Sequence, residues 1–178
     1  MKKILILSCS LLALLAFSPI SQADLIIPMH LTADEEEHGE HIGDVIVRDT
    51  DEGLLIIPDL ENPILEPGLH GFHVHTKPSC ANLGTAAEGH YDPKGTGKHL
   101  GPANDKGHLG DLPFLSVNAK HKAQQPLLAP ELTKKEILGH ALILHEGGDN
   151  FSDSPEKLGG GGNRIACGII TKKGSKAS

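Results

Sequence analysis

The sequence has few aromatic residues: it has no tryptophan, one tyrosine and four phenylalanines among 178 residues. Proteins that bind nucleic acids use basic surfaces and aromatic side chains on which the bases stack. This chain has neither feature in quantity, because it carries 23 acidic residues against 16 basic ones, a formal net charge of −7. We therefore expect no nucleic acid among its partners.

Long apolar runs are also scarce, and the one that stands out lies at the N-terminus. Two lysines precede an apolar run from Ile4 to Phe17, and a short stretch ending in small residues follows it up to Ala23. The run is shorter than the ~20 residues that a membrane-spanning helix needs. Its order of basic, apolar and small residues is that of a secretory signal. We predict a signal peptide at residues 1–23 and one exported domain at residues 24–178, with no membrane segment in the mature form.

Cysteine is the third scarce residue type, with three in the whole chain. Cys9 lies early in the predicted signal, too early for a lipoprotein signal, so the mature chain keeps Cys80 and Cys167. An even pair in an oxidising compartment predicts a disulfide bond, and two buried free thiols are the alternative. The chain-entropy model gives a bridge over so long a loop roughly 4–5 kcal/mol, which is an upper figure.

Helical periodicity is almost missing. Residues 127–137 are the only helix candidate, and Pro126 and Pro130 argue against most of it. Short apolar segments between turn residues are typical of strands instead. These segments are Ile42–Val47, Gly53–Ile57, His70–His75, Ser116–Val117, Ala141–Leu144 and Ile165–Ile170, and we expect Pro58 to end the second. They predict an all-β sandwich or barrel.

Two connections are longer than turns, and loops of such length in a compact domain are usually functional or disordered. They cover residues 76–112 and 146–163, and the first of them holds His90, His99 and His108. A further histidine-rich segment, residues 29–43, has His30, His38 and His41 beside three consecutive glutamates. It is either a mobile tail that collects metal ions or a solvated N-terminal strand and turn, and we favour the strand.

The segment His70-Gly71-Phe72-His73-Val74-His75 contains two histidines in alternation. On a strand, alternate side chains point to the same face, so His73 and His75 can reach one metal ion while Phe72 and Val74 pack on the other side. Two half-exposed histidines would give the same pattern, so the pair alone is weak evidence. Further ligand-type residues elsewhere in the chain strengthen it.

The first long loop adds three histidines and one aspartate, a full tetrahedral set of the kind that structural zinc prefers. These residues are His90, His99, His108 and Asp111. His145, at the end of the apolar segment 141–144, offers a third imidazole to His73 and His75, and imidazole-rich sites suit copper. If His90 bridged both ions through its two ring nitrogens, the copper would gain a fourth ligand.

These segments, together with Leu144-His145-Glu146 and Gly162-Asn163-Arg164-Ile165-Ala166-Cys167-Gly168, resemble a copper–zinc superoxide dismutase. The segments 78–80 and 147–153 resemble the bacterial periplasmic branch of that family. The resemblance implies a Greek-key, Ig-like β-sandwich or barrel of about eight antiparallel strands with two long functional loops, located in the periplasm.

The resemblance also implies roles for individual residues. Copper would be bound by His73, His75, His90 and His145. Zinc would be bound by His90, His99, His108 and Asp111. Asp149 matches a carboxylate that links a copper ligand to a zinc ligand, His70 matches a buried structural histidine, and Arg164 matches the arginine beside the open copper position. His121 and His140 match neither ligand set.

The implied activity is that of an antioxidant enzyme, which converts superoxide to dioxygen and hydrogen peroxide at a redox-cycling copper. The main alternative is a non-enzymatic periplasmic protein that binds and buffers copper, but methionine-rich ligands would then be expected, and the chain has two methionines. A β-sandwich module with a purely structural metal is a second alternative. The sequence leaves open a homodimer, the lysines that steer superoxide and the copper content in the cell.

Overall fold

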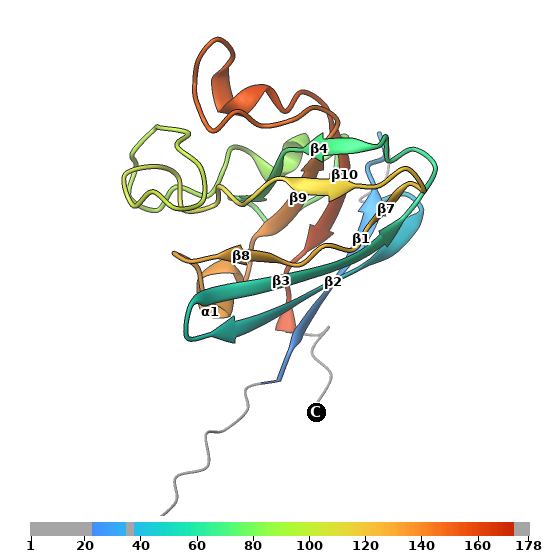
Figure 1. Cartoon of the computed structure of the whole chain (residues 1–178), viewed down its shortest axis with the longest axis horizontal. Helices are drawn as coiled ribbons and strands as arrows, with labels where there is room; N and C mark the ends of the chain where they lie inside the picture. Colours follow the sequence, from blue (N-terminus) through green and yellow to red (C-terminus); the bar gives the residue numbers. More distant parts are fainter. Residues whose placement is uncertain (1–22, 35–37, 173–178) are drawn as a thin grey trace, which may run out of the picture.

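The computed structural model describes residues 23–34 and 38–172, and this part of the chain is built almost entirely from short strands (Figure 1). The strands are β1 Leu25–Leu31, β2 His41–Thr50, β3 Gly53–Glu61, β4 Gly68–His70, β5 Phe72–His75, β6 Leu115–Val117, β7 Lys122–Ala123, β8 Leu127–Ala129, β9 Ala141–His145 and β10 Arg164–Ile169. The helical segments are α1 Lys134–Ile137 and the 3-10 turns η1 Thr85–Ala87 and η2 Lys157–Gly160. The predicted signal peptide lies outside the described residues, apart from Ala23.

All strand pairs are antiparallel. Eight strands form one sheet in the order β5-β9-β10-β1-β2-β3-β7, in which β8 also pairs with β3, while β4 and β6 form a separate pair. The large sheet curls round on itself (Figure 1). The predicted all-β, antiparallel fold is confirmed. Among the described residues, no helix has the length and apolar character needed to cross a membrane.

The core follows from the two-residue period of the strands. In β3, Leu54, Ile56 and Leu60 are buried while the residues between them are more exposed, as alternation predicts. Phe72 and Val74 of β5 belong to the same apolar core. The side chains of His73 and His75 therefore point to the other face of β5, as predicted from the sequence.

Two expectations about strand boundaries were wrong. Pro58 does not end its strand but lies within β3, opposite Val45 of β2. On its other side β3 pairs with β8 only at residues 54–56 and with β7 only at residues 60–61, so Pro58 falls in a gap where no second N–H donor is needed.

The predicted strand 70–75 is also two strands, because β4 pairs with β6 whereas β5 pairs with β9. The chain changes sheets at Gly71, whose N–H donates to the carbonyl of Gly147. The helix candidate 127–137 is helical only in its last four residues, and its first three residues form β8. Pro130 lies between the two segments, in agreement with the expectation that proline interrupts the helix.

The long loop 76–112 is attached to the free edge of β5. Val74 donates its N–H to the carbonyl of Gly110 at 2.9 Å and accepts one from Tyr91 at 2.8 Å, and Thr76 donates to Gly89 at 3.0 Å. The other side of β5 pairs with β9. The loop thus covers the edge of the sheet, and both long loops lie on the opposite side of the molecule from the β2–β3 hairpin (Figure 1).

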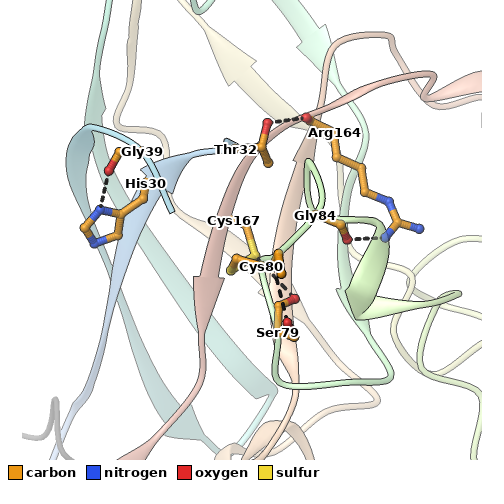
Figure 2. Close-up of a disulfide and its surroundings, with 9 residues drawn as sticks. His30, Thr32, Gly39, Ser79, Cys80, Gly84, Arg164 and Cys167 are labelled. Atoms are coloured by element: carbon orange, nitrogen blue, oxygen red, sulfur yellow. Dashed lines mark hydrogen bonds between the residues drawn. A yellow bond between two sulfur atoms is a disulfide. The ribbon is translucent and has the colours of Figure 1, made fainter. Parts of the chain in front are cut away.

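The predicted disulfide between Cys80 and Cys167 is confirmed, with Cα atoms 5.7 Å apart (Figure 2). It joins the start of the loop 76–112 to the middle of β10. Both cysteines are buried in a small apolar cluster with Ala87, Ala141 and Ile143. The bridge therefore holds the segment around residues 80–88 against the sheet.

Candidate metal centre

Four buried histidines meet beside β5. His73 and His75 lie on β5, His145 ends the neighbouring strand β9, and His90 comes from the loop attached to β5. One nitrogen from each of the four lies within 4.8 Å of one nitrogen of every other. We call this group the copper-side set. The sheet pairing fixes its members in space, because β5 is hydrogen-bonded to β9 on one side and to the loop on the other.

In two rings of this set, Nδ1 is hydrogen-bonded to a backbone carbonyl. His75 Nδ1–H donates to the carbonyl of Glu88 at 2.7 Å, and His145 Nδ1–H donates to that of Gly162 at 3.3 Å. The remaining Nε2 atoms of the two rings face each other at 3.4 Å. A hydrogen bond from one ring nitrogen to a carbonyl fixes the tautomer and leaves the other nitrogen free to bind a metal.

A second group of ligand-type residues shares His90 with the first. The Nδ1 atoms of His90, His99 and His108 lie 2.9, 2.9 and 3.4 Å from Oδ1 of Asp111. All four residues are buried, and their ligand atoms also lie within 4.8 Å of one another. We call this group the zinc-side set. Three nitrogens and one oxygen that converge in this way suit a tetrahedral zinc ion.

Asp149 connects the two sets. Its Oδ2 accepts a hydrogen bond from His73 Nε2 and its Oδ1 one from His99 Nε2, each at 2.7 Å, and its side chain is fully buried. Within the described residues, Nδ1 of His73, His99 and His108 is buried and makes no hydrogen bond. A buried polar atom without a partner is costly, and a metal ion in each set would remove that cost. The residues present therefore fit the two metals.

The electrostatics of the two sets differ. Burial, which disfavours a charged imidazole, lowers the pKa of His73 to about 3 and that of His145 to about 4. Burial acts on His99 in the same direction, but the attraction of the nearby carboxylates of Asp111 and Asp149 outweighs it and raises its pKa to about 9. The copper-side imidazoles are therefore neutral at pH 7, while the zinc side holds two carboxylates close to its histidines.

Two of the four consecutive glycines in the second long loop have a steric cause. A Cβ on Gly159, which has a φ of 75°, would lie 2.1 Å from Oδ1 of Asp149. A Cβ on Gly161 would lie 3.0 Å from Cγ of His145. Glycine lets the backbone pass directly over the carboxylate and the copper-side ring.

Arg164 begins β10 and is half buried beside the copper-side set. Its guanidinium donates to the carbonyl of Gly84, and its own carbonyl accepts a hydrogen bond from Thr32 (Figure 2). The guanidinium also donates to the carbonyl of Glu88 at 2.6 Å. Its positive charge contributes to the lowered pKa of both His75 and His145. The Cys80–Cys167 bridge anchors the segment that carries these two acceptor carbonyls.

A surface hollow of about 450 Å³ opens next to Arg164. It is lined by Leu83, Thr85, Gly162, Asn163 and Arg164. Among the described residues, Arg164 is the only charged side chain in this lining. The lysines of the two long loops, whose positions the sequence left open, are absent from it.

The remaining predicted residue, His70, is buried outside both ligand sets. Its ring nitrogens contact the carbonyl oxygens of His145 at 2.9 Å and of Glu66 at 2.7 Å. It therefore supports the backbone at the copper-side residue His145. His121 and His140 belong to neither set. His121 contacts the carbonyl of Leu65, and His140 contacts that of Thr76.

Sequence reasoning missed the acceptors that hold Arg164 and His75. Gly84 and Glu88 act through backbone carbonyls, which every residue has, so no side-chain pattern marks them. Glu88 has a φ of 62° and a ψ of −150°, a backbone conformation that is rare outside glycine. Asp153 was also missed, and its carboxylate accepts the N–H of His99 at 2.9 Å.

Fold and site together define a class: an antiparallel β-protein with two adjacent metal-ligand sets that share one histidine. Residues 41–170 match the family model of the copper/zinc superoxide dismutases. The chain belongs to this family.

Relatives of known identity agree with the family. The chain is 50% identical over 179 residues to superoxide dismutase [Cu-Zn] 1 of Salmonella typhimurium, covering 96% of this chain and 99% of that protein. It is 45% identical over 172 residues to superoxide dismutase [Cu-Zn] of Escherichia coli, covering 92% and 97%.

Solved structures are similar as well. The Cu/Zn superoxide dismutase from Brucella abortus has a TM-score of 0.77 and 43% identity, covering 83% of this chain and 99% of that chain. The monomeric copper, zinc superoxide dismutase from Salmonella enterica has a TM-score of 0.72 and 44% identity, covering 84% and 100%.

The chain is thus an enzyme that uses copper and zinc to convert superoxide to dioxygen and hydrogen peroxide. Two superoxide ions and two protons give one molecule of each product. The alternative of a non-enzymatic copper-binding protein is not favoured.

Proposed function

We propose that copper is bound by His73, His75, His90 and His145, and zinc by His90, His99, His108 and Asp111. The single observation that carries this proposal is the position of His90, the one residue common to both sets. Its Nδ1 faces Asp111 at 2.9 Å, which leaves its Nε2 for the copper side. Bound copper supplies the one-electron redox chemistry because it alternates between two oxidation states, whereas zinc has a structural role.

We assign the binding and orientation of superoxide to Arg164. The protein as a whole is acidic, so its net charge opposes the approach of a small anion, and a local positive potential must attract it. The guanidinium is always charged and has five N–H donors, of which the carbonyls of Gly84 and Glu88 engage only part. The remaining donors are available to superoxide at the hollow.

The second assigned role is proton transfer at Nε2 of His90. One turnover consumes two protons, and this nitrogen can take up one of them and pass it on whenever its lone pair is not engaged by copper. Burial lowers the pKa of His90, which favours release of a proton once it is bound. Asp149 has an orienting role, because its hydrogen bonds to His73 and His99 present the Nδ1 atoms of both rings.

We also propose that residues 1–23 are a cleaved signal peptide and that the enzyme works in the periplasm. The order of basic, apolar and small residues supports this, and so does the Cys80–Cys167 bridge, because disulfides are typical of oxidising compartments. Mass spectrometry of exported protein should give a chain that begins at or near Asp24. An intact Met1 or a lipid on Cys9 would contradict the proposal.

The oligomeric state has two candidates, a monomer and a homodimer, and the solved relative from Salmonella enterica is described as monomeric. Sedimentation of the metal-loaded protein at several concentrations distinguishes them.

The ligand assignment is tested by metal analysis together with a superoxide consumption assay. Purified mature protein should contain one copper and one zinc per chain. Addition of copper to zinc-loaded protein should restore activity without displacing zinc. Displacement of zinc by the first equivalent of copper would overturn the assignment of separate sets.

A further inference from the structure

Three histidines lie close together outside the metal centre, in the connection between β1 and β2. His30 lies near the end of β1 and His41 begins β2, directly opposite it in the strand register. His38 precedes β2 in the same connection. The rings of His30 and His38 are stacked with centroids 4.4 Å apart, and those of His30 and His41 are 5.1 Å apart. We call these three residues the hairpin cluster.

Two members of the hairpin cluster have one ring nitrogen engaged as metal-binding histidines do. His30 Nδ1–H donates to the carbonyl of Gly39 at 3.2 Å, and His41 Nε2–H donates to Oδ1 of Asp44 at 3.0 Å. A carbonyl or carboxylate on one nitrogen orients the ring and raises the basicity of the other. Within the described residues, Nε2 of His30, Nδ1 of His41 and both nitrogens of His38 have no hydrogen-bond partner. Each ring therefore offers a free nitrogen.

The surroundings favour a cation. Asp34, Glu40 and Asp44 lie in or beside the connection. Burial and the neighbouring His38 and His41 lower the pKa of His30, against the opposing effects of the Gly39 carbonyl and of Asp44. Its imidazole is therefore neutral at pH 7, which is the form that binds metals.

We propose that His30, His38 and His41 form a third metal site, which binds one divalent cation of the zinc or copper type. Imidazole is the ligand that zinc, copper and nickel share. The ligand atoms are spread more widely than the 4.8 Å that encloses each set of the metal centre, so binding needs a rotation of the exposed His38 and His41 side chains. The site lies apart from the reaction, because His30 and Arg164 lie on opposite sides of the disulfide (Figure 2).

Binding at this site should also tighten the connection between β1 and β2. His30 also pairs with Cys167 of β10, so a bound ion would join β1 to β2 at a point where β1 is already paired with β10.

The test uses the enzyme already loaded with copper and zinc, into which Zn²⁺ is titrated by calorimetry. Wild type should take up one further zinc ion per chain. The affinity of the double variant His38→Ala/His41→Ala for this ion should be lower by a factor of about ten or more. Both side chains are exposed, so the variant should fold. His121→Asn is the matched control, since it removes an imidazole elsewhere and asparagine tolerates the φ of 58° at that position.

A second measurement locates the ion. Substoichiometric Cu²⁺ should broaden the amide NMR signals of Leu31, Gly39 and Ile42 in wild type but not in the double variant. Superoxide consumption should be the same in all three proteins, which separates this test from that of the ligand assignment. Absence of further zinc uptake by wild type, or equal uptake by wild type and double variant, would overturn the proposal.

Discussion

The two halves of the metal centre are built in different ways. Three of the four copper-side histidines lie on strands of one sheet, whereas all four zinc-side residues lie in the loop 76–112. The copper-side set has no carboxylate, and burial lowers the pKa of His73, His75 and His145. The zinc side has Asp111 within 3.4 Å of three histidines, and the pKa of His99 is raised.

This difference shows how each half keeps its ligands in place. The copper side depends on backbone pairing between β5 and β9, so its geometry persists when one ligand is removed. The zinc side depends on attraction between a carboxylate, its histidines and the ion, so removal of one charged partner should release the loop. Asp149 links the halves through its hydrogen bonds to His73 and His99.

The largest expected effect is that of His145→Ala. One of four copper-side ligands is lost, so copper and nearly all activity should be lost, while the zinc-side set stays complete and retains its ion. Metal analysis and a superoxide assay measure both. His140→Ala is the control, because His140 precedes the same strand but belongs to neither set. Loss of zinc in step with copper would contradict the separation of the halves.

Asp111→Ala should have the next largest effect. The variant loses the carboxylate around which three histidines converge, and two loop N–H groups, of Leu100 and Gly101, lose their acceptor. Removal of one partner from a buried charged pair costs about 3–5 kcal/mol, so most zinc should be lost and the free energy of unfolding should fall. Chemical denaturation and metal analysis test this. Asp105→Ala, an exposed position in the same loop, should leave both values unchanged.

The double variant Cys80→Ser/Cys167→Ser should have an intermediate effect. Loss of a native bridge costs about 2–4 kcal/mol, and the carbonyls of Gly84 and Glu88 that hold Arg164 lose their anchor. Activity should therefore fall further than copper content does. Reductant should lower the stability of wild type but not that of the variant. Equal sensitivity to reductant would show that the bridge is not the cause.

Arg164→Ala should have a smaller effect on the rate and none on metal content. Arg164 steers and orients superoxide, and steering effects span about 10 to 10³ in rate, so we expect capture to slow by roughly tenfold. The dependence of the rate on ionic strength should flatten as well, because a local field has been removed. Pulse radiolysis at several salt concentrations measures both.

Arg48→Ala is the control for this variant, since it removes the other arginine, which pairs with Asp24 at the surface. Equal rates and equal salt dependence in the Arg164 and Arg48 variants would leave superoxide binding without an assigned residue.

The smallest expected effect concerns the pH dependence of stability after both metals are removed by a chelator. His73 and His145 have pKa values of about 3 and about 4 in the folded chain against an ordinary value of 6.5. The unfolded chain therefore binds more protons below pH 6.5, and their contribution to stability falls as the pH falls from 6.5 towards 4.

His99 acts in the opposite direction. Its pKa of about 9 stabilises the fold below pH 6.5 and loses that contribution as the pH rises towards 9. Because more histidines have a lowered than a raised pKa, the metal-free protein should be less stable at pH 5 than at pH 7. Urea unfolding at the two pH values checks this, and higher stability at pH 5 would contradict it.

Local pattern in the sequence was sufficient for several features. Alternation placed His73 and His75 on the face opposite Phe72 and Val74, as the core shows. The even pair of cysteines predicted the bridge between Cys80 and Cys167. Pattern failed where a residue's role depends on what lies beside it: Pro58 is tolerated in β3 only because the strand lacks a second partner at that point.

The sequence by itself determined the inventory of the centre: six histidines, Asp111 and Asp149 that can bind or orient metals, one arginine directly after the second loop and one cysteine pair. The tertiary structure alone decided which nitrogen of each ring is free, that His90 lies between the two sets, and that the carbonyl of Glu88 holds both His75 and Arg164. These relations join residues 13 to 76 positions apart. They depend on the pairing of β5 with β9 and with the loop at its edge, which no short segment of the chain encodes.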